Sequence, residues 1–360
     1  MTAAGLGHTD VVAVYTILTP TFVQAMVSVY PELNGPPPGH GVVELEGIAQ
    51  GSINTTYRVR LSDDSVWFLR VNEGKPFERL IRERDLLHKL GALHAQLCVV
   101  TPKMAVSVAG SAFFAVDIPS GDRRWACIFP RLPGRELGVF EVDASHALQI
   151  GAFLGRMHRL LRRWPGGPNP YGHRVVQGWL PALVAHSTTS TTALLLQRRL
   201  QSVLRRRRPL PRGLIHGDLF VDNTRWDVAG KTLRAVFDWE MAGRDHLALD
   251  LAITICAWCF RRAGEAMVLR EDVAAALVDG YQHERRLEPS ERRGLHGELL
   301  LASLRFAASR LRDFGLPREA TVERRFLDPA DYVDRFDHVA GLGERRLRGL
   351  LGVSGAGRGT

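Results

Sequence analysis

One stretch of the chain, residues 213–252, constrains the fold more than any other: GLIHGDLFVDNTRWDVAGKTLRAVFDWEMAGRDHLALDLA. The apolar pair Leu214–Ile215 is typical of a buried strand, and a polar loop follows it. A second β-rich run, residues 233–237, ends at Asp238, and Asp250 stands at the head of an apolar helix. The pattern predicts strand, loop, strand and helix in that order, with acidic residues where strands end.

The polar residues of this stretch have the spacing of the catalytic loop of protein kinases. Asp218 and Asn223 are five residues apart, as are the Asp and Asn of the H-R-D-x-x-x-x-N loop. In that loop the Asp orients and deprotonates the attacking hydroxyl, and the Asn binds Mg²⁺. Asp238 stands where kinases carry a further Mg²⁺ ligand. Two acids and an amide suit phosphoryl transfer, which needs an aligned hydroxyl and positive charge on phosphate oxygens. The alternative is an ordinary strand–loop–strand with polar turn residues.

The motifs together resemble the aminoglycoside phosphotransferase and choline kinase superfamily, whose loop is HGDxxxxN, and within it the type II homoserine kinases. The resemblance rests on DLFVDN at 218–223, the strand-end Asp238, DLAI at 250–253 and the Trp258–Cys259 pair, and it extends over residues 18–339. It implies an α+β, two-lobed protein kinase-like fold, with a β-rich N-terminal lobe, a helix-rich C-terminal lobe and the active site in the cleft between them.

The expected division of the chain follows from this order of elements. Residues 1–41 form an N-terminal segment with a short helix, and residues 42–130 form the nucleotide-binding lobe. The sequence PRLPG at 130–134 breaks regular structure and marks a hinge. Residues 131–340 form the catalytic and substrate lobe. The Gly- and Arg-rich residues 341–360 are expected to be a disordered tail.

The first lobe supplies the expected contacts to the ATP phosphates. Residues 42–71 are a predicted β-meander, and its first bend contains Gly51, Ser52 and Asn54. Type II homoserine kinases carry a similar G-x-x-N-x-x-Y stretch, matched here by Gly51, Asn54 and Tyr57, so the resemblance places this bend over the phosphates. A plain β-turn remains the alternative, because Gly and Asn are common turn residues.

Further nucleotide contacts are expected from a charged pair and from the hinge. Arg70 lies on the third strand, where protein kinases carry a phosphate-binding Lys. Glu83 lies on the apolar face of the following helix and needs a partner there, so an Arg70–Glu83 ion pair is predicted. The alternative is that Glu83 is a surface charge. Backbone groups of Ile128, Phe129 and Arg131 are expected to face the adenine edge.

The acceptor site is the least constrained part of the prediction. Arg305 lies beside an apolar helical stripe, and residues 305–310 match an R-F-x-x-S-R segment of type II homoserine kinases. A guanidinium can hold a carboxylate through two hydrogen bonds. Arg305 is therefore a candidate for binding the carboxylate of an amino acid acceptor. A structural ion pair with Asp245 or Asp250 is the alternative.

Composition limits the remaining classes. A hydrophobic content of 45% and a charged content of 24% are those of a globular protein. No apolar run reaches the ~20 residues needed to span a bilayer, and the N-terminus lacks the pattern of a signal peptide, so a cytoplasmic protein is expected. A net charge of +9 suits an anionic partner such as a nucleotide.

Three other features favour structural over functional interpretations. Cys256 and Cys259 form a CxxC in an apolar helix without a second ligand pair, which favours two buried thiols over a redox or zinc pair. His158 is expected to be a buried, hydrogen-bonded residue. The Arg run at 205–208 has no interleaved aromatics, so a solvated helix end is preferred to nucleic-acid binding.

The sequence therefore predicts an ATP- and Mg²⁺-dependent kinase that phosphorylates a small-molecule alcohol, with L-homoserine as the leading acceptor and O-phospho-L-homoserine as the product. Phosphorylation of an aminoglycoside or another amino alcohol is an open alternative. A non-catalytic nucleotide- or RNA-binding protein of the same fold is another, which the set Asp218, Asn223 and Asp238 disfavours. The oligomeric state stays undetermined.

Overall fold

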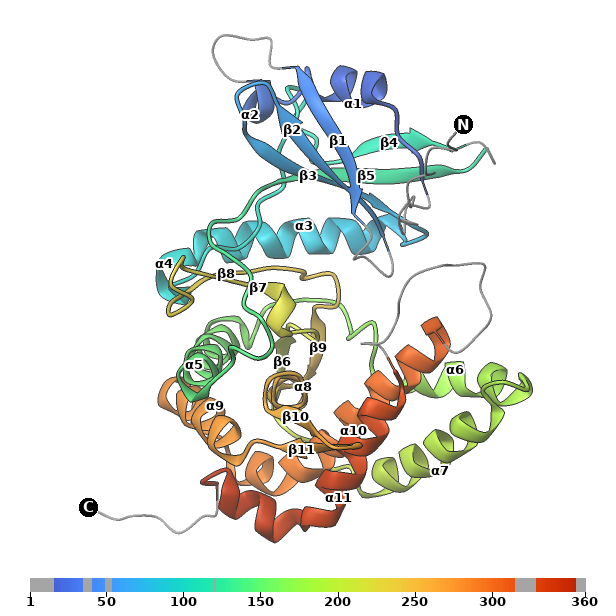
Figure 1. Ribbon diagram of the computed structural model, residues 1–360, viewed down its shortest axis with the longest axis vertical. Coiled ribbons are helices and arrows are strands. Elements are labelled where there is room, and N and C mark those ends of the chain that lie inside the picture. The colour runs from blue at the N-terminus through green and yellow to red at the C-terminus, as the bar shows by residue number, and fades with distance from the viewer. Residues whose placement is uncertain (1–15, 35–40, 49–53, 119–120, 315–327, 354–360) are drawn as a thin grey trace, which may run out of the picture. The chain divides into compact units, whose positions relative to one another are not determined.

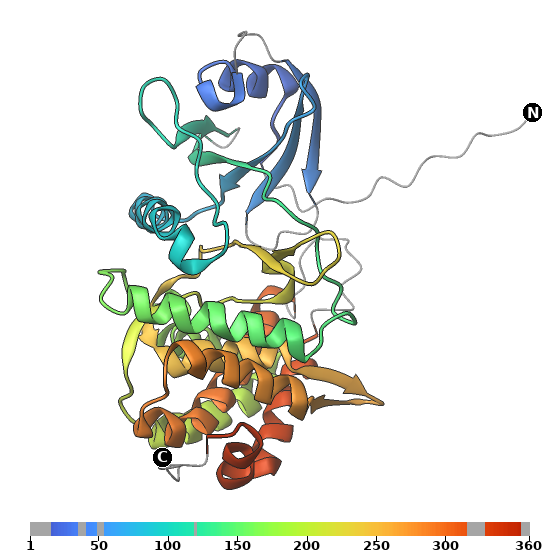
Figure 2. The same ribbon diagram turned by 90° about the vertical axis from the view of Figure 1, so that its left-hand side faces the viewer.

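The computed structural model describes residues 16–34, 41–48, 54–118, 121–314 and 328–353, and the chain divides into two compact units. Among the described residues, the first unit contains those up to Asp85 together with Pro102–Arg131. The second contains Leu86–Thr101 and those from Leu132 onward. Figures 1 and 2 show a predominantly β unit and a predominantly helical unit, which confirms the predicted α+β class.

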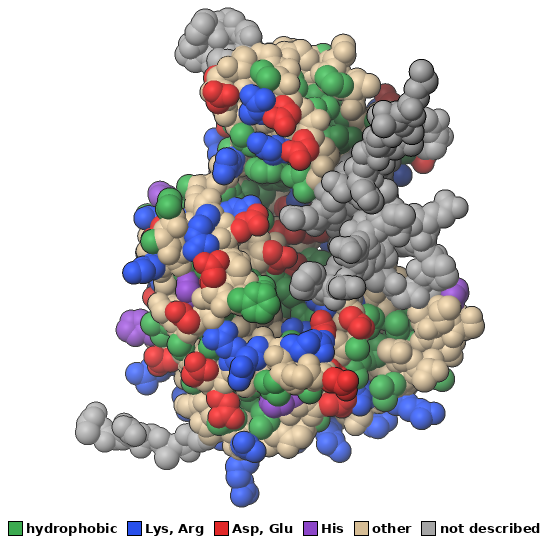
Figure 3. All heavy atoms as spheres, in the orientation of Figure 1, with side chains coloured by type: hydrophobic (Ala, Val, Ile, Leu, Met, Phe, Trp, Pro, Cys, Tyr) green, Lys and Arg blue, Asp and Glu red, His purple; other side chains and the backbone are tan. Residues whose placement is uncertain are grey.

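The first unit is built on one antiparallel sheet of five strands in the order β1-β2-β3-β5-β4. Alternate residues of β2 are buried, as the two-residue period of a strand with one covered face requires. Between β1 and β2, Arg60 pairs with Glu44 at 2.8 Å and Arg58 with Glu46 at 2.9 Å. Figure 3 shows basic and acidic side chains next to one another on this unit. The strands are β1 Val42–Ile48, β2 Thr55–Leu61, β3 Val66–Asn72, β4 Phe114–Asp117 and β5 Arg123–Pro130.

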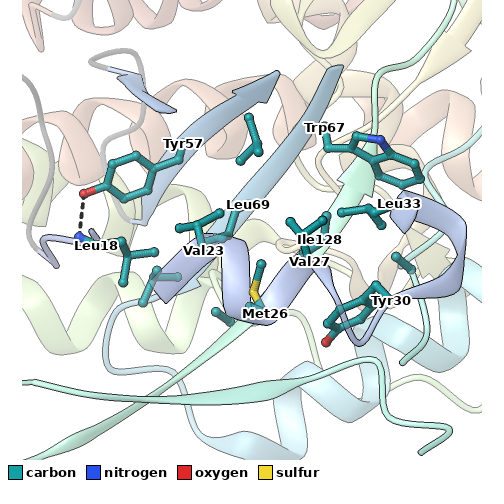
Figure 4. Close-up of a cluster of buried hydrophobic side chains, with 14 of the residues drawn as sticks. Leu18, Val23, Met26, Val27, Tyr30, Leu33, Tyr57, Trp67, Leu69 and Ile128 are labelled. Atoms are coloured by element: carbon teal, nitrogen blue, oxygen red, sulfur yellow. Dashed lines mark hydrogen bonds between the residues drawn. The ribbon is translucent and has the colours of Figure 1, made fainter. Parts of the chain in front are cut away.

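A short helix, α1 Pro20–Val27, covers the inner face of this sheet (Figure 4). It begins where the sequence indicates, because Thr19 caps it by accepting the N–H of Phe22. The hydroxyl of Tyr57 ties the preceding segment to the sheet: it accepts the N–H of Leu18 at 3.1 Å and donates to the carbonyl of Thr16 at 3.0 Å. The cluster that the helix and sheet bury together includes Val23, Met26, Val27, Tyr30, Leu69 and Ile128.

The second unit is mainly helical, and two of its helices pack unusually closely. Helices α5 (Ala144–Leu161) and α9 (Glu271–Glu284) meet at glycines. A Cβ on Gly151 would lie 1.9 Å from the carbonyl oxygen of Leu277, so only glycine allows this approach. The unit's other helices are α4 His94–Leu97, α6 His173–Ala185, α7 Ser190–Arg206, α8 Leu247–Trp258, α10 Pro289–Phe314 and α11 Ala330–Leu350, and α3 Phe77–Ala92 begins in the first unit.

Two small antiparallel ladders in the second unit carry the stretch that dominates the sequence. Strand β6 (Arg212–Ile215) pairs with β9 (Gly243–His246), and β7 (Thr224–Trp226) pairs with β8 (Leu233–Val236). The polar loop leaves β6 and enters β7 through a single 3₁₀ turn at Val221–Asn223. The two predicted strands are confirmed as β6 and β8, and the predicted helix as α8, whereas β7 and β9 were not predicted from the sequence.

The expected disordered tail is wrong for its first part. Helix α11 continues to Leu350, bending at Gly343, where φ is 70°. The sequence pattern was obscured by the many Gly and Arg residues, but the apolar residues among them are buried: Leu347 and Val353 are each 1% exposed, and Leu351 is 2% exposed. Burial of these side chains holds the segment in place. Residues 354–360 lie outside the described part of the chain.

Two further differences concern strands. Residues 105–108, whose sequence AVSV is typical of a strand, form no strand. Only the N–H of Ala105 bonds to the sheet, through the carbonyl of Ile128 at 2.9 Å. A hairpin of β10 (Phe260–Ala263) and β11 (Ala266–Leu269), which the sequence analysis did not predict, follows α8. In the described part of the chain, no helix combines the length and apolar character needed to cross a membrane.

Candidate active site

The loop after β6 owes its path to Gly217. This residue has φ of 78°, a left-handed conformation that glycine adopts without strain. A Cβ at this position would also lie 2.9 Å from the carbonyl oxygen of Met241. The tight turn directs the chain from the buried Ile215 to Asp218, which is partly exposed. Glycine is therefore required between the strand end and the proposed base.

The carboxylate of Asp250, at the start of α8, fixes the backbone of this turn. It accepts the N–H of His216 at 2.7 Å and the N–H of Gly217 at 2.8 Å. Its third partner is the Nε2 of His158, at 3.0 Å. Burial raises the pKa of Asp250, but the hydrogen bonds that its carboxylate accepts from His158 and from the N–H of Gly217 hold that pKa below its ordinary value. Asp250 is therefore a buried anion whose hydrogen bonds shape the loop.

The network behind Asp250 continues into the helices. The Nδ1 of His158 lies 2.8 Å from the hydroxyl of Tyr281, which also accepts from Arg285 at 2.9 Å. Arg285 in turn pairs with the buried Glu291 at 3.0 Å. The expectation that His158 is a buried, hydrogen-bonded residue is confirmed, since its side chain is 0% exposed. The hydrogen bonds that hold Asp250 against the loop therefore extend to residues of α5, α9 and α10.

Asp218 and Asn223 lie in contact, as their spacing predicts. The Nδ2 of Asn223 donates to the backbone carbonyl of Asp218 at 2.8 Å and to its Oδ2 at 3.2 Å. Burial raises the pKa of Asp218 to about 7, against the opposing effect of Arg305. Asp222 and Glu240 contribute to the rise because they are also negative. A carboxyl that titrates near neutral pH suits a general base.

Asp238 is the second residue after β8 and also has a left-handed backbone, with φ of 61°. The preceding residue, Phe237, donates its N–H to the carbonyl of Asn223 at 3.0 Å. This bond brings the end of β8 to the end of the loop that carries Asn223. Positive φ is tolerated by Asp more readily than by most residues, and such conformations are found at functional sites.

Arg305 lies against the same loop from α10. It is 3% exposed, and its Nη1 donates to the carbonyl of Gly217 at 2.6 Å. Its guanidinium carbon lies 5.6 Å from the centre of the Tyr171 ring, and its Nη2 lies 3.2 Å from the sulfur of Met241. Among the residues that the structure describes, no carboxylate forms an ion pair with Arg305.

Neither acid proposed as a structural partner of Arg305 is an ion-pair partner. Asp250 is bonded to the loop backbone and to His158. Asp245 accepts from Asn169 at 3.0 Å and pairs with Arg207 at 3.3 Å. Burial lowers the pKa of Arg305, and the nearby Asp218 opposes this effect. The guanidinium is therefore a buried cation neutralised only from a distance.

In the first unit, the predicted Arg70–Glu83 ion pair is confirmed. The Nη2 of Arg70 lies 2.8 Å from the Oε2 of Glu83, and the two side chains are 12% and 7% exposed. The guanidinium also lies over the ring of Phe129, 5.1 Å from its centre. Of the predicted phosphate bend, Asn54 is 7% exposed, whereas Gly51 and Ser52 lie outside the described residues.

The expectation for the backbone of Arg131 needs a correction. Its N–H donates to the carbonyl of Val66 at 3.1 Å and so extends the pairing of β3 with β5 by one step. This N–H is therefore not free to contact a nucleotide, which leaves only the carbonyl of Arg131 for that role. The sequence pattern PRLPG obscured the extension, because prolines on both sides of Arg131 indicated that regular pairing had ended.

The oxygen atoms at the end of the loop suit a metal ion that is coordinated mainly by phosphate oxygens and water. Because the Nδ2 of Asn223 is bonded to Asp218, its amide oxygen is the side-chain atom that could bind a cation. No group of three or more His, Cys, Asp or Glu residues within the described ranges could hold a metal. Mg²⁺ bound through one or two protein oxygens plus phosphates and water needs no such group.

Cys256 and Cys259 are free and buried, as expected.

Two contributors to the site have no sequence signal of their own. Tyr171, which faces Arg305, comes from the loop before α6, and Met241 comes from the segment between β8 and β9. Both are distant from residue 305 along the chain, so only folding brings them to it. Asp250 was visible in the sequence as part of the DLAI motif, but its two bonds to the loop backbone were not.

A family model decides the class of protein to which this site belongs. Residues 44–324 match the model of the phosphotransferase enzyme family, APH. The chain belongs to this family. The matched residues include the sheet of the first unit and the polar loop of the second, and therefore all the motifs described above.

Two relatives of this phosphotransferase are similar to it over most of their length. The homoserine kinase of Granulibacter bethesdensis is 31% identical over 303 residues, which cover 81% of this chain and 88% of the relative. The homoserine kinase of Gluconobacter oxydans is 29% identical over 340 residues, which cover 91% of this chain and 98% of the relative.

Solved structures resemble the phosphotransferase in fold. The amicoumacin kinase hAmiN superposes with a TM-score of 0.64 at 15% identity, covering 91% of this chain and 92% of that one. The choline kinase of Cryptosporidium parvum superposes with a TM-score of 0.57 at 12% identity, covering 86% and 91%. The kinase-like fold predicted from the sequence is therefore confirmed.

Proposed function

We propose that this phosphotransferase is an ATP- and Mg²⁺-dependent kinase that transfers a phosphoryl group to the side-chain hydroxyl of L-homoserine. The observation that carries the proposal is the held loop: Asp250 accepts two backbone N–H groups of the loop, and Arg305 donates to its Gly217 carbonyl. Groups held in this way need no reorganisation when the acceptor arrives, which favours catalysis by alignment. The homoserine kinases among the relatives support this acceptor.

Asp218 acts as the residue that orients and deprotonates the acceptor hydroxyl. Asn223 fixes the carboxylate through its Nδ2, at 3.2 Å from Oδ2. A pKa of about 7, raised by burial, makes the carboxylate a stronger base than an exposed Asp while leaving a substantial fraction of it ionised near neutral pH. The proton of the hydroxyl passes to Asp218 as the oxygen attacks the terminal phosphorus.

The remaining residues serve the nucleotide. Asn223 and Asp238 would hold Mg²⁺, which when bound neutralises charge on the phosphate oxygens. Arg70, oriented by Glu83 at 2.8 Å, would contact the phosphates from the first unit. The bend at Gly51, Ser52 and Asn54 and the backbone at Phe129 and Arg131 would complete the nucleotide site, the latter through its carbonyl alone. These roles rest on the resemblance in sequence and on the geometry of the pair.

The acceptor assignment rests on Arg305. Its guanidinium is buried, has no carboxylate partner among the described residues and lies within electrostatic reach of Asp218. Burying an unpaired cation is costly unless a ligand supplies the countercharge. The carboxylate of an amino acid acceptor would do so, and this disfavours acceptors that carry only positive charge.

A coupled assay of ADP release tests the acceptor directly. The parent enzyme is compared on L-homoserine, on 3-amino-1-propanol, which is homoserine without its carboxylate, and on an aminoglycoside. The proposal expects the highest kcat/KM on L-homoserine. A higher value on either other acceptor would overturn the assignment of the acceptor, and binding of MgATP without turnover on any alcohol would indicate a non-catalytic protein.

The role of Arg305 is tested by comparing how its replacement changes KM for two acceptors, one with and one without a carboxylate. Arg305→Met should raise KM for L-homoserine by about tenfold or more, the scale of a hydrogen bond to a charged group, and change KM for 3-amino-1-propanol little. Arg206→Ala, at the exposed end of α7, is the control for loss of one positive charge. Equal losses on both acceptors would make Arg305 a positioning residue for Gly217.

A further inference from the structure

Beyond Arg305, helices α10 and α11 bring two more arginines to one aromatic ring. The guanidinium carbons of Arg310 and Arg335 lie 4.5 Å and 4.2 Å from the centre of the Tyr332 ring. Tyr332 is 1% exposed and stacks on Phe306, with ring centres 5.2 Å apart. Phe306 in turn meets the ring of Phe220 in the catalytic loop at 5.0 Å. The cluster is therefore joined to the loop through aromatic contacts.

Neither arginine of this cluster is hydrogen-bonded to a carboxylate of a residue that the structure describes. Arg335 has no carboxylate in ion-pair range there; its one hydrogen bond to a described residue runs from Nη1 to the backbone carbonyl of Asp331 at 3.3 Å, and its Nε is buried without a partner. Arg310 donates to the backbone carbonyl of Asp328 at 3.2 Å and forms a longer ion pair with the carboxylate of Asp331, at 3.6 Å. That carboxylate is already bonded to Arg262.

The hydroxyl of Tyr332 adds a further donor. None of the residues that the structure describes forms a hydrogen bond with it, although the side chain as a whole is almost fully buried. The pKa values agree with a cluster short of negative charge: burial lowers the pKa of Arg310, and the neighbouring Arg335 lowers it further despite Asp331 and Asp328.

We propose that Arg310, Arg335 and the hydroxyl of Tyr332 form a subsite for an oxyanion group, a carboxylate or a phosphate. Two guanidinium groups and one hydroxyl offer more donors than the surrounding protein accepts, and an oxyanion supplies both the acceptor oxygens and the missing charge. The source of the group is either the acceptor itself or a separate small anion. Binding of the oxyanion does not depend on the acceptor being homoserine.

The test is a calorimetric titration of the full chain with inorganic phosphate, at an ionic strength held constant with chloride and without nucleotide or acceptor. The parent should bind phosphate. Arg335→Gln should weaken binding about tenfold, because a hydrogen bond to a charged group contributes about 1.5–3 kcal/mol. Arg346→Gln, on the same helix and 68% exposed, removes the same charge and should leave binding unchanged.

Tyr332→Phe guards against a folding defect, since it removes only the hydroxyl and preserves the stack on Phe306. It should also weaken phosphate binding while leaving the melting temperature close to that of the parent. Phosphate affinity equal to the parent in both Arg335→Gln and Tyr332→Phe, or no binding by the parent, would overturn the subsite.

Repeating the titration with saturating L-homoserine identifies the source. Competition assigns the subsite to the acceptor's carboxylate, and undiminished phosphate binding assigns it to a separate anion; either result keeps the oxyanion subsite. Because the titration needs no turnover, failure of the homoserine kinase assignment and failure of the subsite are seen in different experiments.

Discussion

Asp250 accepts the backbone N–H of Gly217 at 2.8 Å, and this bond joins the start of α8 to the turn that precedes Asp218. Arg305 donates to the carbonyl of the same Gly217 at 2.6 Å. The backbone N–H and the backbone carbonyl of Gly217 are therefore both hydrogen-bonded to buried, charged side chains. A loop held at its backbone cannot easily shift the carboxylate that follows.

Removing the charge of Asp218 should remove most of the turnover. Asp218→Asn keeps the shape and the contact with Asn223 but cannot accept the hydroxyl proton. We expect kcat to fall by about 10²-fold or more, the scale of losing a general base. Nucleotide affinity, measured by calorimetry, should stay near that of the parent. Turnover close to the parent value would exclude Asp218 as the base.

The pH dependence of kcat/KM should report Asp218. Its pKa is about 7, so the parent should lose activity as pH falls below neutrality and the carboxylate becomes protonated. Arg305 lowers that pKa, so Arg305→Met should move the acidic limb of the profile to higher pH. Arg206→Ala is the control for charge. A limb that stays in place in Arg305→Met would contradict the electrostatic coupling.

Metal dependence should reside in Asp238. Asp238→Ala removes one of two proposed oxygen ligands, and an ion with few protein contacts tolerates such a loss poorly. We expect the tightening of ATP binding by Mg²⁺ to disappear in titrations with and without the metal. Asp227→Ala, a change of the same type on the exposed turn between β7 and β8, should leave it intact. A parent-like response of Asp238→Ala to Mg²⁺ would argue for other ligands.

The Arg70–Glu83 pair should contribute to both stability and nucleotide affinity. Arg70→Met leaves the buried carboxylate of Glu83 without its partner, and breaking a buried pair costs about 3 kcal/mol. Arg58→Met, whose pair with Glu46 is 39% and 55% exposed, should cost under about 1 kcal/mol. Urea denaturation measures both variants, and KM for ATP should rise in Arg70→Met alone.

A double variant separates the two contributions of that pair. Arg70→Met with Glu83→Gln removes the unpaired charge and should regain part of the lost free energy of unfolding. If Arg70 contacts phosphate, KM for ATP should remain high in the double variant. Recovery of KM together with stability would mean that the pair has only a structural role.

His216 should contribute stability that is lost in mild acid. Burial lowers the pKa of this residue from 6.5 to about 4 in the folded protein. Between these values the unfolded chain binds more protons at this residue, so the contribution of His216 to the free energy of unfolding rises with pH from about 4 to about 6.5, whereas Asp218, whose pKa folding raises from 3.8 to about 7, contributes the opposite slope. His216→Asn should reduce this slope. Denaturant titrations at pH 5 and pH 7 measure it, and an unchanged slope would contradict a neutral, buried His216.

The sequence by itself determined the fold class, the strands β6 and β8, the helix α8 and the meeting of Asp218 with Asn223. These features depend on local spacing and on periodicity, which the amino acids display directly. The Arg70–Glu83 pair was also predictable, because a carboxylate on an apolar helix face requires a cation nearby.

Only the tertiary structure decided which groups surround the loop. The backbone bonds of Asp250, the ring of Tyr171 over Arg305 and the cluster of Arg310, Arg335 and Tyr332 join segments distant in the chain. Helix α11 was missed beyond residue 340 for a related reason: its few apolar side chains become stabilising only when other helices bury them. The local sequence pattern determines where helices and strands form. The role of each side chain depends on its burial and on the charges around it, which arise only when the elements pack together.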